Sequence, residues 1–184
     1  MKLLFCVLFV LAASFPSFSF ADDYVDPGTF TWGIGVGGAL TGTGFGPAYN
    51  GGYGLDGNIG FVLNQNLTLL LAIDSFIFQA NTNGYFSGEA NFLPSLRYSF
   101  TGLGIKPYLQ GGVGLNENTY FYPVSSNMND VTTTSLAIGI GAGIEIPVND
   151  HFGIYFQGKY EEDFPTGGGV TYFPISLGVQ FLQD

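Results

Sequence analysis

The sequence predicts an all-β fold, an eight-stranded antiparallel up-and-down transmembrane β-barrel that follows a cleaved signal peptide. Two observations carry this prediction. Apolar side chains recur at every second position in eight segments of roughly ten residues, the length that a tilted strand needs to cross a bilayer. Charged residues make up only 10% of the chain and aromatic residues 17%, which leaves too little charge to cover a soluble domain.

The start of the chain predicts export. A short basic start precedes an apolar run, and Ser19 and Ala21 place small residues three and one before a cleavage point. We therefore expect a signal peptide over 1–21 and one barrel domain over 22–184. The alternative, a membrane-spanning helix, would need about 20 apolar residues, and this run is shorter. Cys6, the only cysteine, lies inside the signal.

Each predicted strand alternates large apolar residues with small or polar ones. In the first, Trp32, Ile34 and Val36 alternate with glycines. The third is apolar at nearly every position, and Asp74 sets its phase. Pro94 falls inside the fourth and cannot donate a ladder hydrogen bond, so we expect a local bulge there. The eight segments are 30–40, 53–63, 67–78, 86–100, 108–115, 135–146, 152–160 and 173–181.

The connections support a closed sheet. An even number of strands lets the sheet close with both chain ends on one side, and closure pairs every backbone group that would face hydrocarbon. Longer connections mostly alternate with shorter ones, which predicts one end with loops and one with tight turns. The longer ones are 41–50, 116–131 and 161–169, the shorter ones 64–66, 101–104 and 147–150, and 81–84 is a short exception.

Charged side chains on the inner phase predict a polar lumen, and none of them is stable in a narrow interior without a partner. We expect Arg97 to pair with Glu145, and Lys159 to pair with Glu89 or Asp56. These groups would either neutralise one another and plug the barrel, or form a polar path or gate for small solutes. The predicted lumen residues are Asp56, Asp74, Glu89, Arg97, Glu145 and Lys159.

Two connections hold candidate contact residues. An aromatic group within 116–131 could bind an extracellular protein, and an acidic tip within 161–169 could hold divalent cations shared with lipopolysaccharide. Alternatively, the aromatic rings anchor the loop at the lipid interface and the acids are only solvated. The candidates are Tyr120, Phe121, Tyr122, Glu161, Glu162 and Asp163.

Several function classes are disfavoured. Apart from Lys2 the chain has three basic residues against 14 acidic ones, so nucleic acid is not an expected partner. We expect no enzyme, because the only histidine, His151, lies in a predicted turn, while Asp74 and Ser75 point to opposite faces of one strand. No cluster has metal-ligand spacing, and we expect no cofactor or metal.

A soluble lipocalin is the structural alternative, because it also has eight antiparallel strands. It would turn the apolar face inward. A barrel of eight strands is just wide enough to be filled by side chains, and the large apolar residues of this chain are too many for that space.

The signal peptide, the alternating strands, the tyrosines and phenylalanines near strand ends and the aromatic end of the last strand together resemble a known family. They are similar to the small, porin-like outer-membrane barrels of Gram-negative bacteria, such as the OmpA membrane domain, OmpX and OmpW, over residues 28–181. Family members usually end at a final phenylalanine, whereas three residues follow Phe181 here.

The resemblance implies a location and partners. It places the chain in the bacterial outer membrane as a monomer, with both termini in the periplasm, among outer-membrane lipid and lipopolysaccharide and served by the barrel assembly machinery. The expected function is structural or surface-binding, supporting envelope integrity or adhesion through extracellular loops. The alternatives are a narrow channel for small, apolar solutes, as the OmpW resemblance implies, and, more remotely, a lipid A-modifying barrel enzyme.

Overall fold

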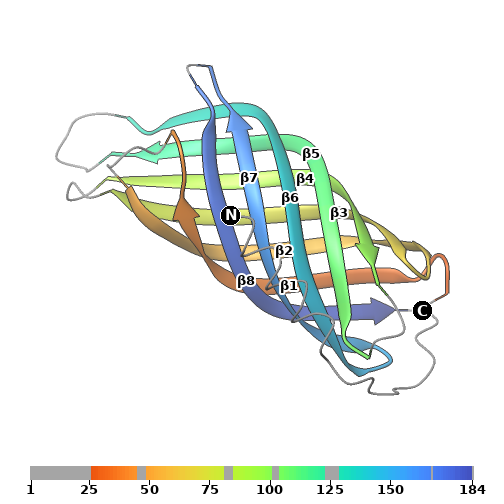
Figure 1. Ribbon diagram of the computed structural model, residues 1–184. Coiled ribbons are helices and arrows are strands. Elements are labelled where there is room, and N and C mark those ends of the chain that lie inside the picture. The colour runs from red at the N-terminus through yellow and green to blue at the C-terminus, as the bar shows by residue number, and fades with distance from the viewer. Residues whose placement is uncertain are drawn as a thin grey trace, which may run out of the picture.

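The computed structural model describes residues 26–44, 49–80, 85–100, 104–122, 129–166 and 168–183. The expected signal peptide lies outside them. The described residues form eight strands, each antiparallel to its neighbours in the chain, and β1 also pairs with β8, which closes the barrel (Figure 1). They contain no helix long and apolar enough to cross a membrane. The strands are β1 (Phe30–Thr41), β2 (Tyr49–Asn64), β3 (Leu67–Ala80), β4 (Phe86–Ser99), β5 (Lys106–Phe121), β6 (Val131–Asn149), β7 (Phe152–Phe164) and β8 (Val170–Gln183).

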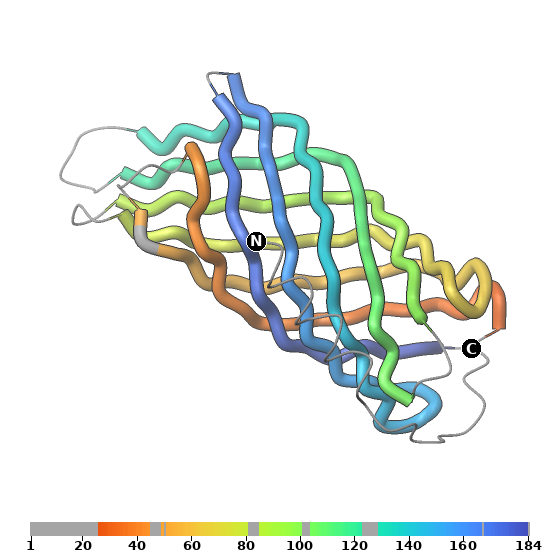
Figure 2. Tube along the Cα trace, viewed as in Figure 1, coloured from red at the N-terminus to blue at the C-terminus, as the bar shows by residue number. Residues whose placement is uncertain are grey.

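The strands are staggered as they go around the barrel. Thr31 in β1 opposes Gly60 in β2, and successive partners lead through Glu161 in β7 and Tyr172 in β8 back to β1 at Thr41. One circuit therefore rises by ten residues along β1. With about 3.3 Å per residue and about 4.7 Å between strands, this stagger tilts the strands by roughly 40° from the barrel axis. Figure 2 shows the tilt.

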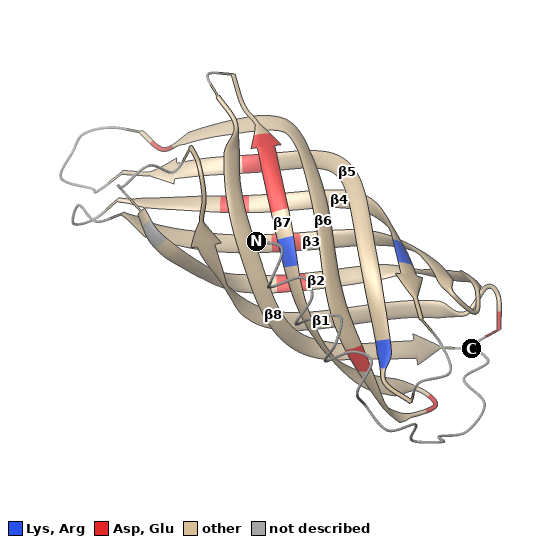
Figure 3. Cartoon of the chain, viewed as in Figure 1, with Lys and Arg blue, Asp and Glu red and all other residues tan. Residues whose placement is uncertain are grey.

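The two faces of the barrel wall differ in polarity as the alternation predicts. Outward side chains such as Leu136 and Ile140 are each 62% exposed, whereas Tyr155 on the inner face is fully buried. Figure 3 shows that charged residues are few over the whole barrel. An apolar outer face over all eight strands fits hydrocarbon and would be unfavourable in water.

Asparagine side chains close two of the tight turns. The Asn64 Oδ1 atom accepts hydrogen bonds from the backbone N–H groups of Asn66 and Leu67 at 2.9 and 3.0 Å. Between β6 and β7, Asn149 Oδ1 accepts from the N–H of His151 at 3.0 Å. Such bonds replace a backbone partner inside a turn. We call this end of the barrel the short-turn end, and the opposite end, where β5 passes to β6, the hairpin end.

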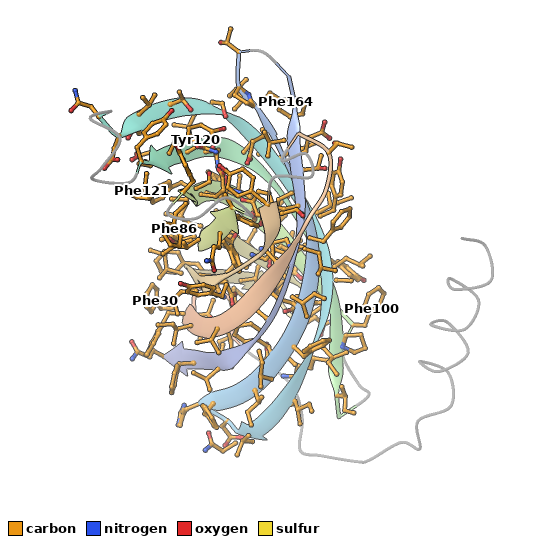
Figure 4. All side chains as sticks on the ribbon, turned by 90° about the vertical axis from the view of Figure 1, so that its left-hand side faces the viewer. Phe30, Phe86, Phe100, Tyr120, Phe121 and Phe164 are labelled. Carbon is orange, nitrogen blue, oxygen red and sulfur yellow. The ribbon has the colours of Figure 1, made fainter. Side chains whose placement is uncertain are left out.

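Aromatic side chains collect near both ends of the barrel. At the short-turn end the ring of Trp32 stacks on Phe181, with centroids 4.3 Å apart. At the hairpin end Phe86 lies opposite Phe121 in the β4–β5 ladder, and Figure 4 shows both side chains there. Aromatic rings are favoured at the boundary between lipid and water.

Pro94 causes no bulge, so that expectation is wrong. Pairing of β4 with β5 is interrupted at Leu93 and Pro94 and resumes at Ser95 in the same register. Pairing with β3 continues, with Pro94 opposite Leu71. The sheet therefore omits the pairing that a proline cannot support and keeps its alignment on both sides.

Several strands run further than the alternation predicts. β5 continues to Phe121, β6 starts at Val131, β7 continues to Phe164 and β8 continues past Phe181 to Gln183. Beyond the apolar belt, backbone pairing can continue where lipid no longer imposes alternating polarity on the side chains. The hydrophobic period therefore marks only the part of each strand that faces lipid.

Two glycines of β2 test the tight inner packing. A Cβ atom at the inward Gly54 would overlap the carbonyl oxygen of Ser75 and lie 2.8 Å from the ring of Phe76, whereas at the outward Gly57 the nearest atom is 3.4 Å away. We expect Gly54→Ala to lower the free energy of unfolding by about 1–3 kcal/mol and Gly57→Ala to change it by no more than about 0.5 kcal/mol. Urea unfolding followed by the fluorescence of Trp32, the only tryptophan, measures both; equal effects would contradict the packing argument.

Candidate functional site in the barrel lumen

The lumen near the short-turn end is organised around Arg97. Its Nε and Nη2 atoms donate to Gln110 Oε1 at 3.2 and 3.1 Å, and Nη1 donates to Gln180 Oε1 at 3.3 Å. The guanidinium carbon lies 4.4 Å from the centre of the Tyr108 ring. Gln180 is itself held by its Nε2 atom, which donates to Thr31 Oγ1 at 2.6 Å. Arg97 is 4% exposed, so this cation is buried among neutral partners.

A second group of polar side chains lies around Asp56. Its Oδ2 atom accepts hydrogen bonds from the Tyr155 hydroxyl at 2.8 Å and from Gln157 Nε2 at 2.6 Å. Gln157 in turn accepts a hydrogen bond from the Tyr108 hydroxyl at 3.1 Å, so Tyr108 links this group to the Arg97 group. The two groups therefore form one continuous network in the half of the lumen nearer the short-turn end.

Lys159 supplies the cation of the central lumen. Its Nζ atom lies 2.5 Å from Asp74 Oδ1 and 3.7 Å from Glu161 Oε1. The side chains of Lys159 and of both acids are nearly inaccessible to solvent, at 6% and 0% exposure. A buried ion pair of this kind is strongly coupled, because removing one partner leaves the other charge without compensation.

Amide side chains bind the acids toward the hairpin end. Asn91 Nδ2 donates to Glu161 Oε2 at 2.7 Å, and Asn116 Nδ2 donates to Glu89 Oε2 at 3.0 Å. Asn118 Nδ2 also donates to Glu89. Side-chain amides can supply the donors that buried carboxylates need, and here they stand where cations would otherwise be required.

Some buried acid oxygens have no hydrogen-bond partner among the described residues. These are both carboxylate oxygens of Asp163 and one each of Asp56, Asp74 and Glu161. Asp163 is 1% exposed. The hairpin-end half of the lumen therefore holds more acid than Lys159 and the amides compensate.

Large side chains close the lumen toward the hairpin end. Phe76, Phe78 and Tyr172 are fully buried and pack with Ala39 and Val170. The Phe78 and Tyr172 rings meet edge to face with centroids 5.5 Å apart. The lumen contains a cavity of about 50 Å³ at the short-turn end and another of about 10 Å³ near Lys159. The smaller one has room for roughly one water molecule.

The predicted lumen residues all lie on the inner wall, but their pairing differs from the expectation. Lys159 does not pair with Glu89 or Asp56; it contacts Asp74 and Glu161 instead. No ion pair joins Arg97 to Glu145 among the described residues, although both line the larger cavity. Gln110 and Gln180 hold Arg97 instead, and both are neutral residues that a search for opposite charges overlooks.

The candidate contact residues divide between strand and loop. Tyr120 and Phe121 are the last residues of β5, and Tyr122 follows, with its ring 6.0 Å from that of Tyr85. The expected loop position of the acidic residues is wrong, because all three residues, Glu161, Glu162 and Asp163, lie in β7. Glu161 and Asp163 point into the lumen, and Glu162 on the outer phase accepts a hydrogen bond from the Tyr160 hydroxyl at 2.7 Å. They do not form the acidic loop tip expected either to hold divalent cations or to be solvated.

The fold does not bring Asp74, Ser75 and His151 together as a catalytic acid, hydroxyl and histidine. Asp74 is buried beside Lys159, whereas Ser75 is exposed on the outer face and His151 is exposed in the turn after β6. In the described part of the chain, no group of three or more His, Cys, Asp or Glu residues is placed to hold a metal ion.

Solved structures with the same fold are small membrane barrels. Neisserial surface protein A (NspA) superposes with a TM-score of 0.59 at 20% identity, covering 83% of this chain and 96% of that one. OprG of Pseudomonas aeruginosa gives 0.62 at 14% identity, covering 87% and 98%. Ail of Yersinia pestis gives 0.55 at 13% identity, covering 85% and 100%. The chain therefore has the fold of a small transmembrane β-barrel of the outer-membrane type.

Comparison by sequence gives nothing further. No protein-family model matches the chain, and no curated protein matches it.

Lys159 provides the first test of the lumen network. We expect Lys159→Met to lower the free energy of unfolding by about 3–5 kcal/mol, because Asp74 and Glu161 would stay buried without their cation. Urea unfolding of the refolded barrel measures the loss. Adding Asp74→Asn to that variant should recover part of it, and Lys106→Met at the edge of the lumen should cost less. A Lys159→Met barrel as stable as the wild type would contradict the assignment.

Proposed function

We propose that this chain is a closed outer-membrane barrel with a structural or surface-binding role, exported by a signal peptide over 1–21. The filled lumen is the observation that carries the proposal. Arg97 lies over the ring of Tyr108, and hydrogen bonds run from Tyr108 through Gln157 to Asp56. Nearer the hairpin end Lys159 binds Asp74, and Phe78 packs with Tyr172. A cavity of about 50 Å³ at one end is far smaller than an aqueous channel through the barrel requires.

The hairpin end supports a surface role. The first residues of β6, from Val131 to Ser135, pair with β5, whereas the pairing of β6 with β7 begins only at Leu136. The β5–β6 hairpin therefore projects beyond β7, with one edge unpaired among the described strands and Phe121 39% exposed. In the proposed orientation this end faces outward from the cell and both termini lie in the periplasm. Projecting loops and hairpins on a rigid scaffold are where such barrels bind partners.

The distribution of basic residues limits which class of partner the hairpin end can bind. Ail has been crystallised in complex with the heparin analogue sucrose octasulfate. Here Arg97 and Lys159 are buried in the lumen, Lys106 begins β5 at the short-turn end, and the connections at the hairpin end contain neither lysine nor arginine. A sulfated polysaccharide would find no cation there. The hairpin end therefore suits an uncharged or basic partner that contacts aromatic and amide groups.

Conductance tests the closed lumen. The full-length protein, refolded and added to a planar lipid bilayer, should give no unitary current steps, whereas a general porin in the same bilayer gives them. We expect this because the lumen network and the Phe78–Tyr172 contact occupy the interior between the two ends of the barrel. Regular current steps from pure protein, changed by Arg97→Ala, would favour the narrow-channel alternative and contradict the proposal.

Heparin binding tests the partner class. In nanodiscs made of lipids without net charge, the barrel should be retained on a heparin column no more than empty nanodiscs. The full chain has a net charge of −10, and the connections at the hairpin end contain neither lysine nor arginine. Retention that is lost with rising salt would show a polyanion site and contradict the assignment.

A further inference from the structure

The cavity at the short-turn end holds a buried cation without an opposite charge. Arg97 donates three hydrogen bonds, all to glutamine oxygens of Gln110 and Gln180. Among the described residues no carboxylate lies within ion-pair distance of Arg97. Lys159, in the central part of the same lumen, has two acids beside it. A guanidinium carries five N–H groups, so two of them have no partner among the described residues. Burial of an ionised group with only neutral partners is unfavourable.

The cavity beside Arg97 has the size and the polarity to complete its coordination. Its volume is about 50 Å³, room for roughly four water molecules or for one carboxylate or phosphate group. Lys106, Glu145 and Ser99 also line it, along with Gln180. Lys106 and Glu145 oppose each other in the β5–β6 ladder, so the charged groups of the cavity are two cations and one acid.

We propose that this cavity binds a small oxyanion group, a carboxylate or a phosphate, through the Arg97 guanidinium. The planar fork of an arginine matches the two oxygens of such a group. Gln110 and Gln180 act as positioning residues, because their oxygens accept from three of the five N–H groups and leave the other two for the anion. Glu145 is the like charge in the cavity and weakens the binding. The site requires neither conduction nor a particular partner at the hairpin end.

A single nuclear magnetic resonance signal can report on this site. Arg97 is the only arginine in the sequence, so its Nε–H group gives one side-chain resonance that needs no assignment by mutation. The full-length barrel in an uncharged sugar detergent is titrated with sodium phosphate or sodium acetate, at ionic strength held constant with sodium chloride. We expect a saturable shift of this resonance with phosphate or acetate. No shift, or the same shift with chloride alone, would overturn the proposal.

Two variants with the same change in charge separate a site from general attraction. Glu145→Gln removes the acid from the cavity and should tighten phosphate binding about three- to tenfold, as expected when a like charge is removed from the lining of the same cavity. Glu117→Gln, on the exposed phase of β5 toward the hairpin end, should leave the affinity unchanged. Equal effects of the two variants would show that phosphate responds only to net charge, and would overturn the site.

Two detergents distinguish a free solute from a lipid headgroup as the source of the oxyanion. If a free solute is the ligand, the resonance shifts in the sugar detergent only when phosphate or acetate is added. If a lipid headgroup is the ligand, micelles of a phosphocholine detergent shift the Arg97 resonance without any added anion, and Glu145→Gln enhances that shift. A shift in phosphocholine that Glu145→Gln does not enhance would contradict binding in this cavity.

Discussion

The rest of the structure depends on the pairing of backbone N–H and C=O groups away from water. A sheet edge in hydrocarbon would leave those groups unpaired at a cost of several kcal/mol each, so β1 must meet β8. Closure with a stagger of ten residues over eight strands sets the width of the barrel. That width leaves an interior which side chains fill, so the same constraint that permits the fold makes the lumen a core. Pro94 shows how strict the alignment is, because the sheet omits pairing beside it and does not shift register.

This core is polar, unlike that of a soluble domain, because the apolar side chains are committed to the lipid face. Its inner volume is filled by a mixture of large rings, amides and charges, and glycines such as Gly54 make room for rings such as Phe76. The charges cannot rely on water, so their partners decide whether the core is stable. Lys159 contacts two acids, Glu89 accepts hydrogen bonds from asparagine amides, and Arg97 donates to glutamine oxygens. These contacts occupy much of the interior and involve only residues of the barrel wall.

The alternation of side chains predicted the eight strands, their inner and outer faces, and the burial of residues such as Asp74 and Arg97. It could not predict which inward residues meet, because a period of two fixes the face of a side chain and not its height. Height depends on the stagger, which becomes measurable only once β1 and β8 are aligned. That is why Asp74 was absent from the expected partners of Lys159. The acidic residues of β7 were misplaced for a related reason: Glu161 and Glu162 break the hydrophobic period, although backbone pairing continues through them to Phe164.

The charges along the lumen are unequally distributed, and this has a consequence for what each end can bind. Toward the hairpin end, Asp163 and Glu89 are buried and contact no basic residue in the described part of the chain. Phe76, Phe78 and Tyr172 pack together between Lys159 and that end. Toward the short-turn end, the cation of Arg97 lines a cavity, and its contacts among the described residues are two glutamine oxygens and the face of the Tyr108 ring. A negative group is therefore attracted from the short-turn end and repelled from the hairpin end. Because Phe76, Phe78 and Tyr172 are packed between the two ends, the proposed binding of an anion at the short-turn end does not depend on passage through the barrel, and anion binding and conduction can be tested separately.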